Sequence, residues 1–148
     1  MVSEARANIG AVLIDGRALL IGGPSGSGKS ILALELIDRG AILIGDDGVT
    51  LEARGKALWA SPSPRTAGLL EVRNVDLIEM RATSGPVALL VELTPEAPRY
   101  VERAETWSAL GVDIPLIRLD PVIGANAIRV ETALERHGLP HRSDTPAG

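Results

Sequence analysis

Short apolar runs separated by glycine, proline and polar turns dominate the chain, and most of them have the length of β-strands. Two pairs of runs predict hairpins, namely Ala11–Asp15 with Ala18–Ile21 around Gly16-Arg17, and Val49–Glu52 with Ala57–Ala60 around Arg54-Gly55. Further apolar runs predict strands at Ala41–Ile44, Leu69–Val72, Val87–Leu93 and Ile114–Leu119.

Two longer segments have the apolar spacing of helices. The first runs from Lys29 to Arg39, and Gly40 is placed to end it with a left-handed backbone conformation. The second, Asn126 to Arg136, carries Ala127, Val130 and Leu134 on one face. Gly138 and Pro140 are placed to end this helix, and residues 137–148 are expected to form a flexible tail. The whole chain, residues 1–148, is thus predicted to be one α/β domain.

Composition narrows the function classes. The 45% hydrophobic fraction is almost entirely aliphatic, and the absence of cysteine excludes disulfides, thiolate catalysis and cysteine-based zinc sites. A net charge of −4 without a basic stripe argues against a nucleic-acid binder. The chain has no apolar run of membrane-spanning length and its first residues are polar. We therefore expect a cytoplasmic protein with no membrane partner.

A complete phosphate-binding motif, G-x-x-x-x-G-K-S, lies between the strand that ends at Ile21 and the first helix. In such a loop, successive backbone amides point at phosphate oxygens, a lysine supplies positive charge, and a hydroxyl can hold Mg²⁺. The alternative is a Gly/Ser linker that carries a lysine. The flanking strand and helix favour a nucleotide site made of Gly23, Pro24, Ser25, Gly26, Ser27, Gly28, Lys29 and Ser30.

Asp46 and Asp47 directly follow the strand after the first helix. Ligands of α/β sheets bind beyond the carboxyl ends of strands, where these carboxylates are expected. If the chain turns between Gly45 and Gly48, both can serve one site, one at a metal ion and the other as a proton acceptor. The alternative is a turn built of good turn-forming residues without chemistry.

Together these motifs resemble the catalytic domain of HPr kinase/phosphorylase, a bacterial enzyme that phosphorylates a serine of the phosphocarrier protein HPr and regulates the phosphotransferase system. The resemblance runs from Asn8 to Arg136 and rests on the phosphate loop, the A-L-E-L-I-D-R-G run of residues 33–40, Asp46-Asp47 and Leu70-Glu71-Val72-Arg73. It implies the short form, a single P-loop kinase domain with a strand-rich sheet and few helices, related in its core to phosphoenolpyruvate carboxykinase.

The resemblance implies roles for individual residues and the use of ATP and Mg²⁺. Lys29 resembles the phosphate-binding lysine and Ser30 a Mg²⁺ ligand. Asp47 resembles the proton acceptor of the kinase reaction, and Glu71 the second Mg²⁺ ligand. Asp46 is left with either role, metal ligand or base.

Several positions depart from the family pattern. Asn8 stands where the family has an active-site histidine, and an amide cannot titrate near neutral pH. Ala125 replaces the arginine of a P-G-R-N segment tied to phosphate attack on phosphoserine. Arg73 is followed by asparagine in place of glycine, and Arg103 corresponds to a family arginine in an altered context. We therefore expect a kinase with weak or absent phosphorylase activity.

The resemblance further implies an HPr-like protein as substrate and a homo-oligomer, a hexamer in the family. Two alternatives stay open. A small-molecule kinase could use the same loop, although such enzymes usually close an arginine-bearing lid for which this chain has little room. A nucleotide-binding regulator without turnover would explain Asn8 and Ala125. Whether ATP or pyrophosphate is the phosphoryl donor is also open.

Overall fold

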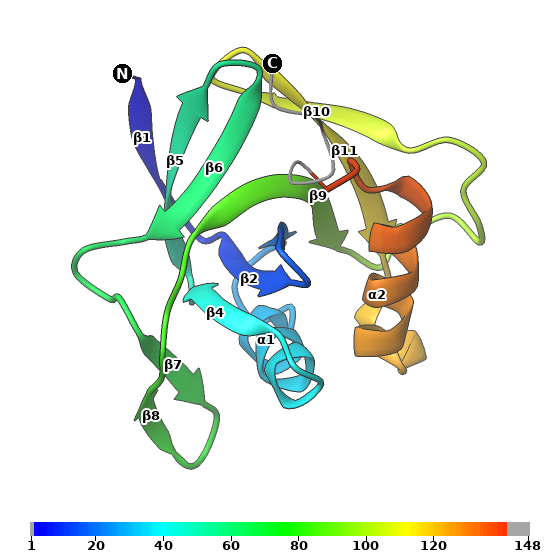
Figure 1. Ribbon diagram of the computed structural model, residues 1–148. Coiled ribbons are helices and arrows are strands. Elements are labelled where there is room, and N and C mark those ends of the chain that lie inside the picture. The colour runs from blue at the N-terminus through cyan, green and yellow to red at the C-terminus, as the bar shows by residue number, and fades with distance from the viewer. Residues whose placement is uncertain (1, 142–148) are drawn as a thin grey trace.

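Strands make up most of the fold, and two helices lie together against one face of the main sheet (Figure 1). The computed structural model describes residues 2–141. The strands are β1 (Ser3–Ala7), β2 (Gly10–Ile14), β3 (Arg17–Gly22), β4 (Ile42–Gly45), β5 (Gly48–Arg54), β6 (Ala57–Pro62), β7 (Leu69–Val72), β8 (Asp76–Glu79), β9 (Gly85–Leu93), β10 (Glu105–Ala109) and β11 (Val112–Leu119). The helices are α1 (Lys29–Asp38), α2 (Asn126–His137) and the short 3₁₀ helix η1 (Pro121–Ile123). Among the described residues, no helix is both long and apolar enough to cross a membrane.

Strand β9 lies at the centre of a nine-stranded mixed sheet. The strand order is β1-β5-β6-β9-β3-β2-β4, and β11 with β10 branches from β9. β9 pairs in parallel with β3 and, through Leu90–Leu93, with β11. Its first residues, Gly85 and Pro86, pair antiparallel with β6. Because β3, β9 and β11 are parallel, their carboxyl ends meet at one edge of the sheet, where ligands of α/β folds bind.

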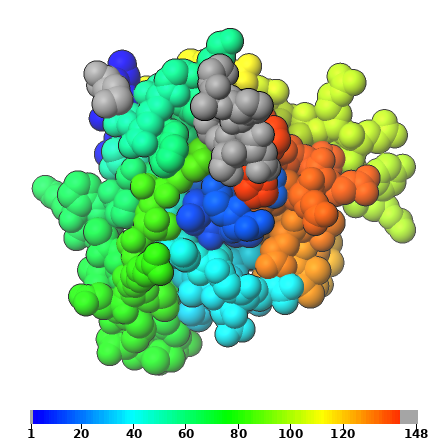
Figure 2. Space-filling view, in the orientation of Figure 1, coloured from blue at the N-terminus to red at the C-terminus, as the bar shows by residue number. Residues whose placement is uncertain are grey.

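Both faces of the sheet are buried, which explains the nearly continuous apolar runs of its central strands. Leu19 and Ile21 of β3 pack on the face covered by α1 and α2, while Leu20 packs on the opposite face. That second core is closed by β5, β6, β10 and β11. The hairpin β7–β8 forms a separate two-stranded sheet, and Figure 2 shows it at the lower left, beside the surface of α1, where Leu70 joins the core.

The predicted hairpins are confirmed, but each turn lies one residue from its predicted position. Ile14 pairs with Arg17, so the first turn is Asp15-Gly16, and both of these residues have positive φ (49° and 81°). This is the conformation that Asp-Gly favours in a two-residue hairpin turn. Arg54 pairs with Ala57, so the second turn is at residues 55–56.

The expected flexible tail does not begin at residue 137. Helix α2 continues through His137, and the Leu139 amide donates to the Ala88 carbonyl at 2.9 Å. The Arg17 guanidinium donates to the Leu139 carbonyl at 3.1 Å. The chain after α2 therefore returns to the sheet and is held there through residue 141. The rest of the predicted tail, residues 142–148, lies outside the described residues.

Candidate active site at the phosphate loop

The glycine-rich loop connects the end of β3 to the start of α1, as the motif predicts. The Ser27 amide donates to the Pro24 carbonyl at 3.1 Å and closes the turn. Gly23 has φ +139°, and a Cβ there would lie 2.8 Å from Ser27 Oγ and 3.0 Å from the Leu93 carbonyl oxygen. Only glycine fits this position, because the loop packs directly against the end of the neighbouring strand β9.

Lys29 is the first residue of α1 and, within residues 2–141, the charged residue with the least exposed surface, at 8%. Its Nζ donates to the carbonyls of Gly23 at 2.7 Å and Pro24 at 3.1 Å. These bonds hold the ammonium group over the loop at the N-terminal end of α1. Buried positive charge and a helix N-terminus together make this a place for an anion.

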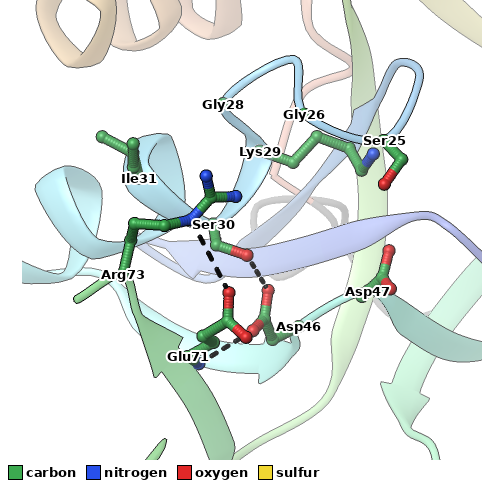
Figure 3. A pocket seen from close by; sticks show the side chains of 10 residues that line it. All are labelled: Ser25, Gly26, Gly28, Lys29, Ser30, Ile31, Asp46, Asp47, Glu71 and Arg73. Atoms are coloured by element: carbon green, nitrogen blue, oxygen red, sulfur yellow. Dashed lines mark hydrogen bonds and ion pairs between the residues drawn. The ribbon is translucent and has the colours of Figure 1, made fainter. Parts of the chain in front are cut away.

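Asp46 follows β4 and joins two separate parts of the site. Its Oδ1 accepts a hydrogen bond from Ser30 Oγ at 2.6 Å, and its Oδ2 accepts one from the Glu71 amide at 3.0 Å (Figure 3). The carboxylate therefore connects the hydroxyl of the phosphate loop to the base of the β7–β8 hairpin.

Asp47 occupies the tight turn between β4 and β5 and points in a different direction. Its backbone is left-handed (φ 59°), its side chain is exposed, and in Figure 3 the carboxylate is directed towards the phosphate loop, apart from Asp46. A Cβ at Gly45 would collide with the Gly48 carbonyl oxygen, so the turn needs glycine before the acidic pair. The predicted turn is present, and it brings both carboxylates to one pocket.

Glu71 and Arg73 enter from β7 on the other side of the pocket. The two side chains are 63% and 65% exposed, and Arg73 Nε lies 3.9 Å from Glu71 Oε1. Such an exposed pair contributes little to stability. Both side chains are therefore available to a ligand.

One hollow of about 150 Å³ is lined by these residues, which come from three separate segments of the chain. Its lining consists of Ser25, Gly26, Gly28, Lys29, Ser30, Ile31, Asp46, Asp47, Glu71 and Arg73. The predicted loop, acidic pair and E-V-R segment thus meet in space. Ile31, which is 53% exposed, was not anticipated, because its place in the helical pattern gave no sign that it faces a ligand.

The oxygen donors in this pocket fit Mg²⁺. Within residues 2–141, no three acidic or histidine side chains are arranged to enclose a metal ion by themselves. Mg²⁺ is usually held by only one or two carboxylates together with substrate phosphates and waters. Ser30 Oγ and the Asp46 carboxylate, already in contact, supply such a partial set, and Glu71 brings a further carboxylate to the pocket from the hairpin.

Three other predicted positions lie outside the lining of this pocket. The Asn8 amide donates to the Asp47 carbonyl at 3.1 Å, so Asn8 supports the acidic turn through its backbone. Ala125 precedes α2 in a left-handed conformation (φ 52°). Arg103 lies between β9 and β10 beside a separate hollow that includes Glu105 and Arg118. There a hydrogen bond from Arg118 lowers the pKa of Glu105, and the same bond raises the pKa of Arg118.

Comparison with known proteins confirms the resemblance to HPr kinase/phosphorylase. Residues 3–145 match the family model described as HPr Serine kinase C-terminal domain. HPr kinase/phosphorylase of Streptococcus agalactiae is 32% identical over 93% of this chain and 49% of its own length. The Streptococcus uberis enzyme is 31% identical over the same shares. The chain thus spans about half the length of the curated relatives it matches.

A solved structure agrees with the sequence relatives. The structure of the HPr(Ser) kinase/phosphatase from Coxiella burnetii superposes with a TM-score of 0.75 at 26% identity. The match covers 89% of this chain and 88% of that one. From its sequence, its strand-rich fold and the contents of its pocket, the chain belongs to the HPr serine kinase C-terminal domain family.

Proposed function

We propose that this chain is an ATP- and Mg²⁺-dependent protein-serine kinase domain whose acceptor is an HPr-like phosphocarrier protein. The observation that carries the proposal is the meeting of Lys29, Ser30, Asp46 and Asp47 in one pocket beside Glu71. Phosphoryl transfer needs mainly alignment and charge neutralisation, and these side chains supply both. The acceptor is inferred from the names of the relatives, which are HPr kinases. We further propose that, through this acceptor, the protein regulates the phosphotransferase system.

The residues divide into a binding group and a reacting group. Loop amides and the Lys29 ammonium bind the phosphates of ATP, and Ser30, Asp46 and Glu71 would hold Mg²⁺. When bound, the metal ion neutralises charge that develops on the phosphate oxygens. Asp46 is assigned to the binding group because its two oxygens accept hydrogen bonds from the Ser30 hydroxyl and the Glu71 amide, which hold the carboxylate beside the phosphate loop.

Asp47 is the proposed base. Among the described residues its carboxylate has no hydrogen-bond or ion-pair partner, and it is exposed where a protein substrate can approach. As the serine oxygen forms its bond to the γ-phosphorus, the bond from that phosphorus to ADP breaks and the serine proton passes to Asp47. Asp46 cannot take this proton without giving up its present contacts.

The reverse reaction, phosphate attack on phosphoserine, is proposed to be weak or absent. Asn8 offers no titratable group next to Asp47, and Ala125 offers no cation for a second phosphate. We also propose, from the family resemblance alone, that the protein acts in the cytoplasm as a homo-oligomer.

Incubation with ATP, Mg²⁺ and purified HPr tests the proposal, with mass spectrometry of HPr as the readout. A gain of one phosphate on a serine supports it. With small metabolites added, phosphoryl transfer to one of them while HPr stays unmodified would identify a small-molecule kinase. Tight ATP binding without any transfer would identify the regulator that Asn8 and Ala125 suggest. A parallel reaction with pyrophosphate in place of ATP identifies the donor.

A further inference from the structure

The phosphate pocket is too small and too polar to hold a whole nucleotide. Its volume of about 150 Å³ is below the 300–1,000 Å³ that is usual for pockets of drug-sized ligands. Its one large aliphatic side chain, Ile31, lies on the same side as Arg73 in Figure 3. A triphosphate tail fits such a site, but the nucleoside must rest on a different surface.

The sheet topology indicates where that surface is. Asp46 and Asp47 follow β4, which lies beyond β2 on one side of β3. The reacting end of the triphosphate therefore points towards β4. The nucleoside end points the other way, over the carboxyl ends of β9 and β11. With strands spaced about 4.8 Å apart, the end of β11 is about 10 Å from the end of β3.

At that place the chain presents two exposed aliphatic side chains. η1 follows β11 directly, and its Val122 and Ile123 are 87% and 71% exposed. Val122 has the highest exposure of the large hydrophobic residues in the described part of the chain. These two neighbouring side chains offer an apolar surface to a ligand at the carboxyl ends of β9 and β11.

The segment that carries this pair is held rigidly. The Asp120 carboxylate accepts a hydrogen bond from the Val122 amide at 3.0 Å. From α2, the Arg129 guanidinium donates to the carbonyls of Asp120 and Gly124 at 3.0 and 3.2 Å. The end of β11 is also tied to β9, because the Thr94 amide donates to the Leu119 carbonyl at 3.0 Å. A preordered surface binds a ligand at lower entropic cost than a mobile loop does.

We propose that Val122 and Ile123 form the base-binding surface of the nucleotide site, on which the purine ring of ATP packs. This inference rests on the proposed function, because it assumes that the phosphates of a nucleotide occupy the loop. It assigns η1 a role in choosing between nucleotides and inorganic polyphosphates. The two tryptophans are placed elsewhere, Trp59 on β6 and Trp107 on β10, and Tyr100 lies between β9 and β10.

The test compares two ligands on one protein. Calorimetry measures the Kd of ATP and of inorganic tripolyphosphate, each with Mg²⁺, for the natural chain and for the double variant Val122→Ser/Ile123→Ser. We expect the double variant to lose about ten-fold in ATP affinity, because it loses apolar contact area, and to bind tripolyphosphate within two-fold of the natural chain. The matched control is Val2→Ser, an exposed valine (64%) before β1.

Each other outcome has a definite meaning. Unchanged ATP affinity, or an equal loss for both ligands, would overturn the base-binding surface while the phosphate loop stands. If the double variant keeps its ATP affinity but has a changed sedimentation coefficient, η1 is instead a contact between copies of the chain. If it keeps its ATP affinity but has a raised KM for the acceptor protein, η1 is instead the docking site of that acceptor. If the natural chain binds neither ligand, the proposed function itself fails.

Discussion

At the scale of single residues, the burial and the hydrogen bonds of Lys29 are the clearest indication that the loop binds an anion. Its side chain is nearly buried, and within residues 2–141 its ammonium group is paired with two backbone carbonyls of its own loop, those of Gly23 and Pro24, and with no carboxylate. A cation in such a place is incompletely compensated, because carbonyl dipoles offset less than an anion does. The residue is thus prepared for a phosphate oxygen before any ligand arrives.

Lys29→Ala is expected to lower the affinity for ATP about 10- to 100-fold, the usual worth of a hydrogen bond to a charged group. Calorimetric titration with ATP and Mg²⁺ measures the loss. The chain offers a matched control in Lys56→Ala, which removes the other, exposed lysine in the turn between β5 and β6. Equal affinities for the two variants would contradict the role given to the loop.

The neighbouring carboxylates are expected to separate binding from chemistry. Asp47→Asn should slow phosphoryl transfer about 10²- to 10⁴-fold, the range of a general base, and leave the Kd of ATP unchanged. Asp46→Asn should raise the Mg²⁺ concentration needed for half-maximal rate, because it alters the group that contacts Ser30. Quenched-flow measurement of HPr phosphorylation distinguishes the two. If Asp47→Asn keeps full activity and Asp46→Asn has none, then Asp46 is the base and Asp47 the metal ligand.

At the scale of elements, the turn from β4 to β5 fixes the directions of the two carboxylates. The turn is closed by contact between Gly45 and Gly48 and is supported by the Asn8 amide on the Asp47 carbonyl. Left-handed backbone at Asp47 reverses the chain so that neighbouring side chains serve one pocket. In an ordinary strand the two carboxylates would lie on opposite faces.

Gly45→Ala is therefore expected to destabilise the fold by about 1–3 kcal/mol, the usual cost of overpacking. Gly10→Ala is the matched control, because its Cβ would lie 3.5 Å from the Gly45 carbonyl oxygen, an ordinary contact. Urea unfolding measures both. A Gly45→Ala midpoint equal to that of Gly10→Ala would show that the turn can relax without loss.

The sequence predicted those elements whose apolar pattern is local and missed those defined by distant partners. The hairpins, both helices and the phosphate loop follow from short-range signals. Strand β1, S-E-A-R-A, has no apolar run and exists because it pairs with β5, more than 40 residues later in the chain. Strands β8 and β10 pair with their chain neighbours β7 and β11, and they were missed because they are largely exposed and carry no long apolar run.

The candidate site was predictable in its residues but not in its contacts. The motif and the acidic pair named Lys29, Ser30, Asp46 and Asp47 from spacing alone. The contact of Asp46 with the Glu71 amide depends on where a separate hairpin packs, which local patterns do not encode. The exposure of Val122 was also hidden, because apolar residues after a strand are ordinarily read as core.

At the scale of the whole molecule, two apolar cores share the same central strands. Residues of β3 and β9 alternate between the core under the helices and the core closed by β5, β6, β10 and β11. Neither core can be lost without exposing the other face of these strands. The molecule should therefore unfold in one cooperative step.

Two probes on opposite sides of the sheet test this expectation. Trp59 and Trp107 lie on β6 and β10, whereas the helical circular dichroism signal comes from α1 and α2 on the other face. Urea transitions followed by tryptophan fluorescence and by circular dichroism at 222 nm should coincide. Separated midpoints would show that the two halves unfold independently.

The double contact of Asp46 has a consequence for proteolysis. One carboxylate holds both the phosphate-loop hydroxyl and the hairpin that carries Glu71. A ligand of the phosphate loop that alters the contacts of this carboxylate changes the free energy of opening the β7–β8 hairpin. By linkage, opening the hairpin changes the binding free energy of that ligand by the same amount. Cleavage within residues 71–79 would then report occupancy of the phosphate loop without any turnover.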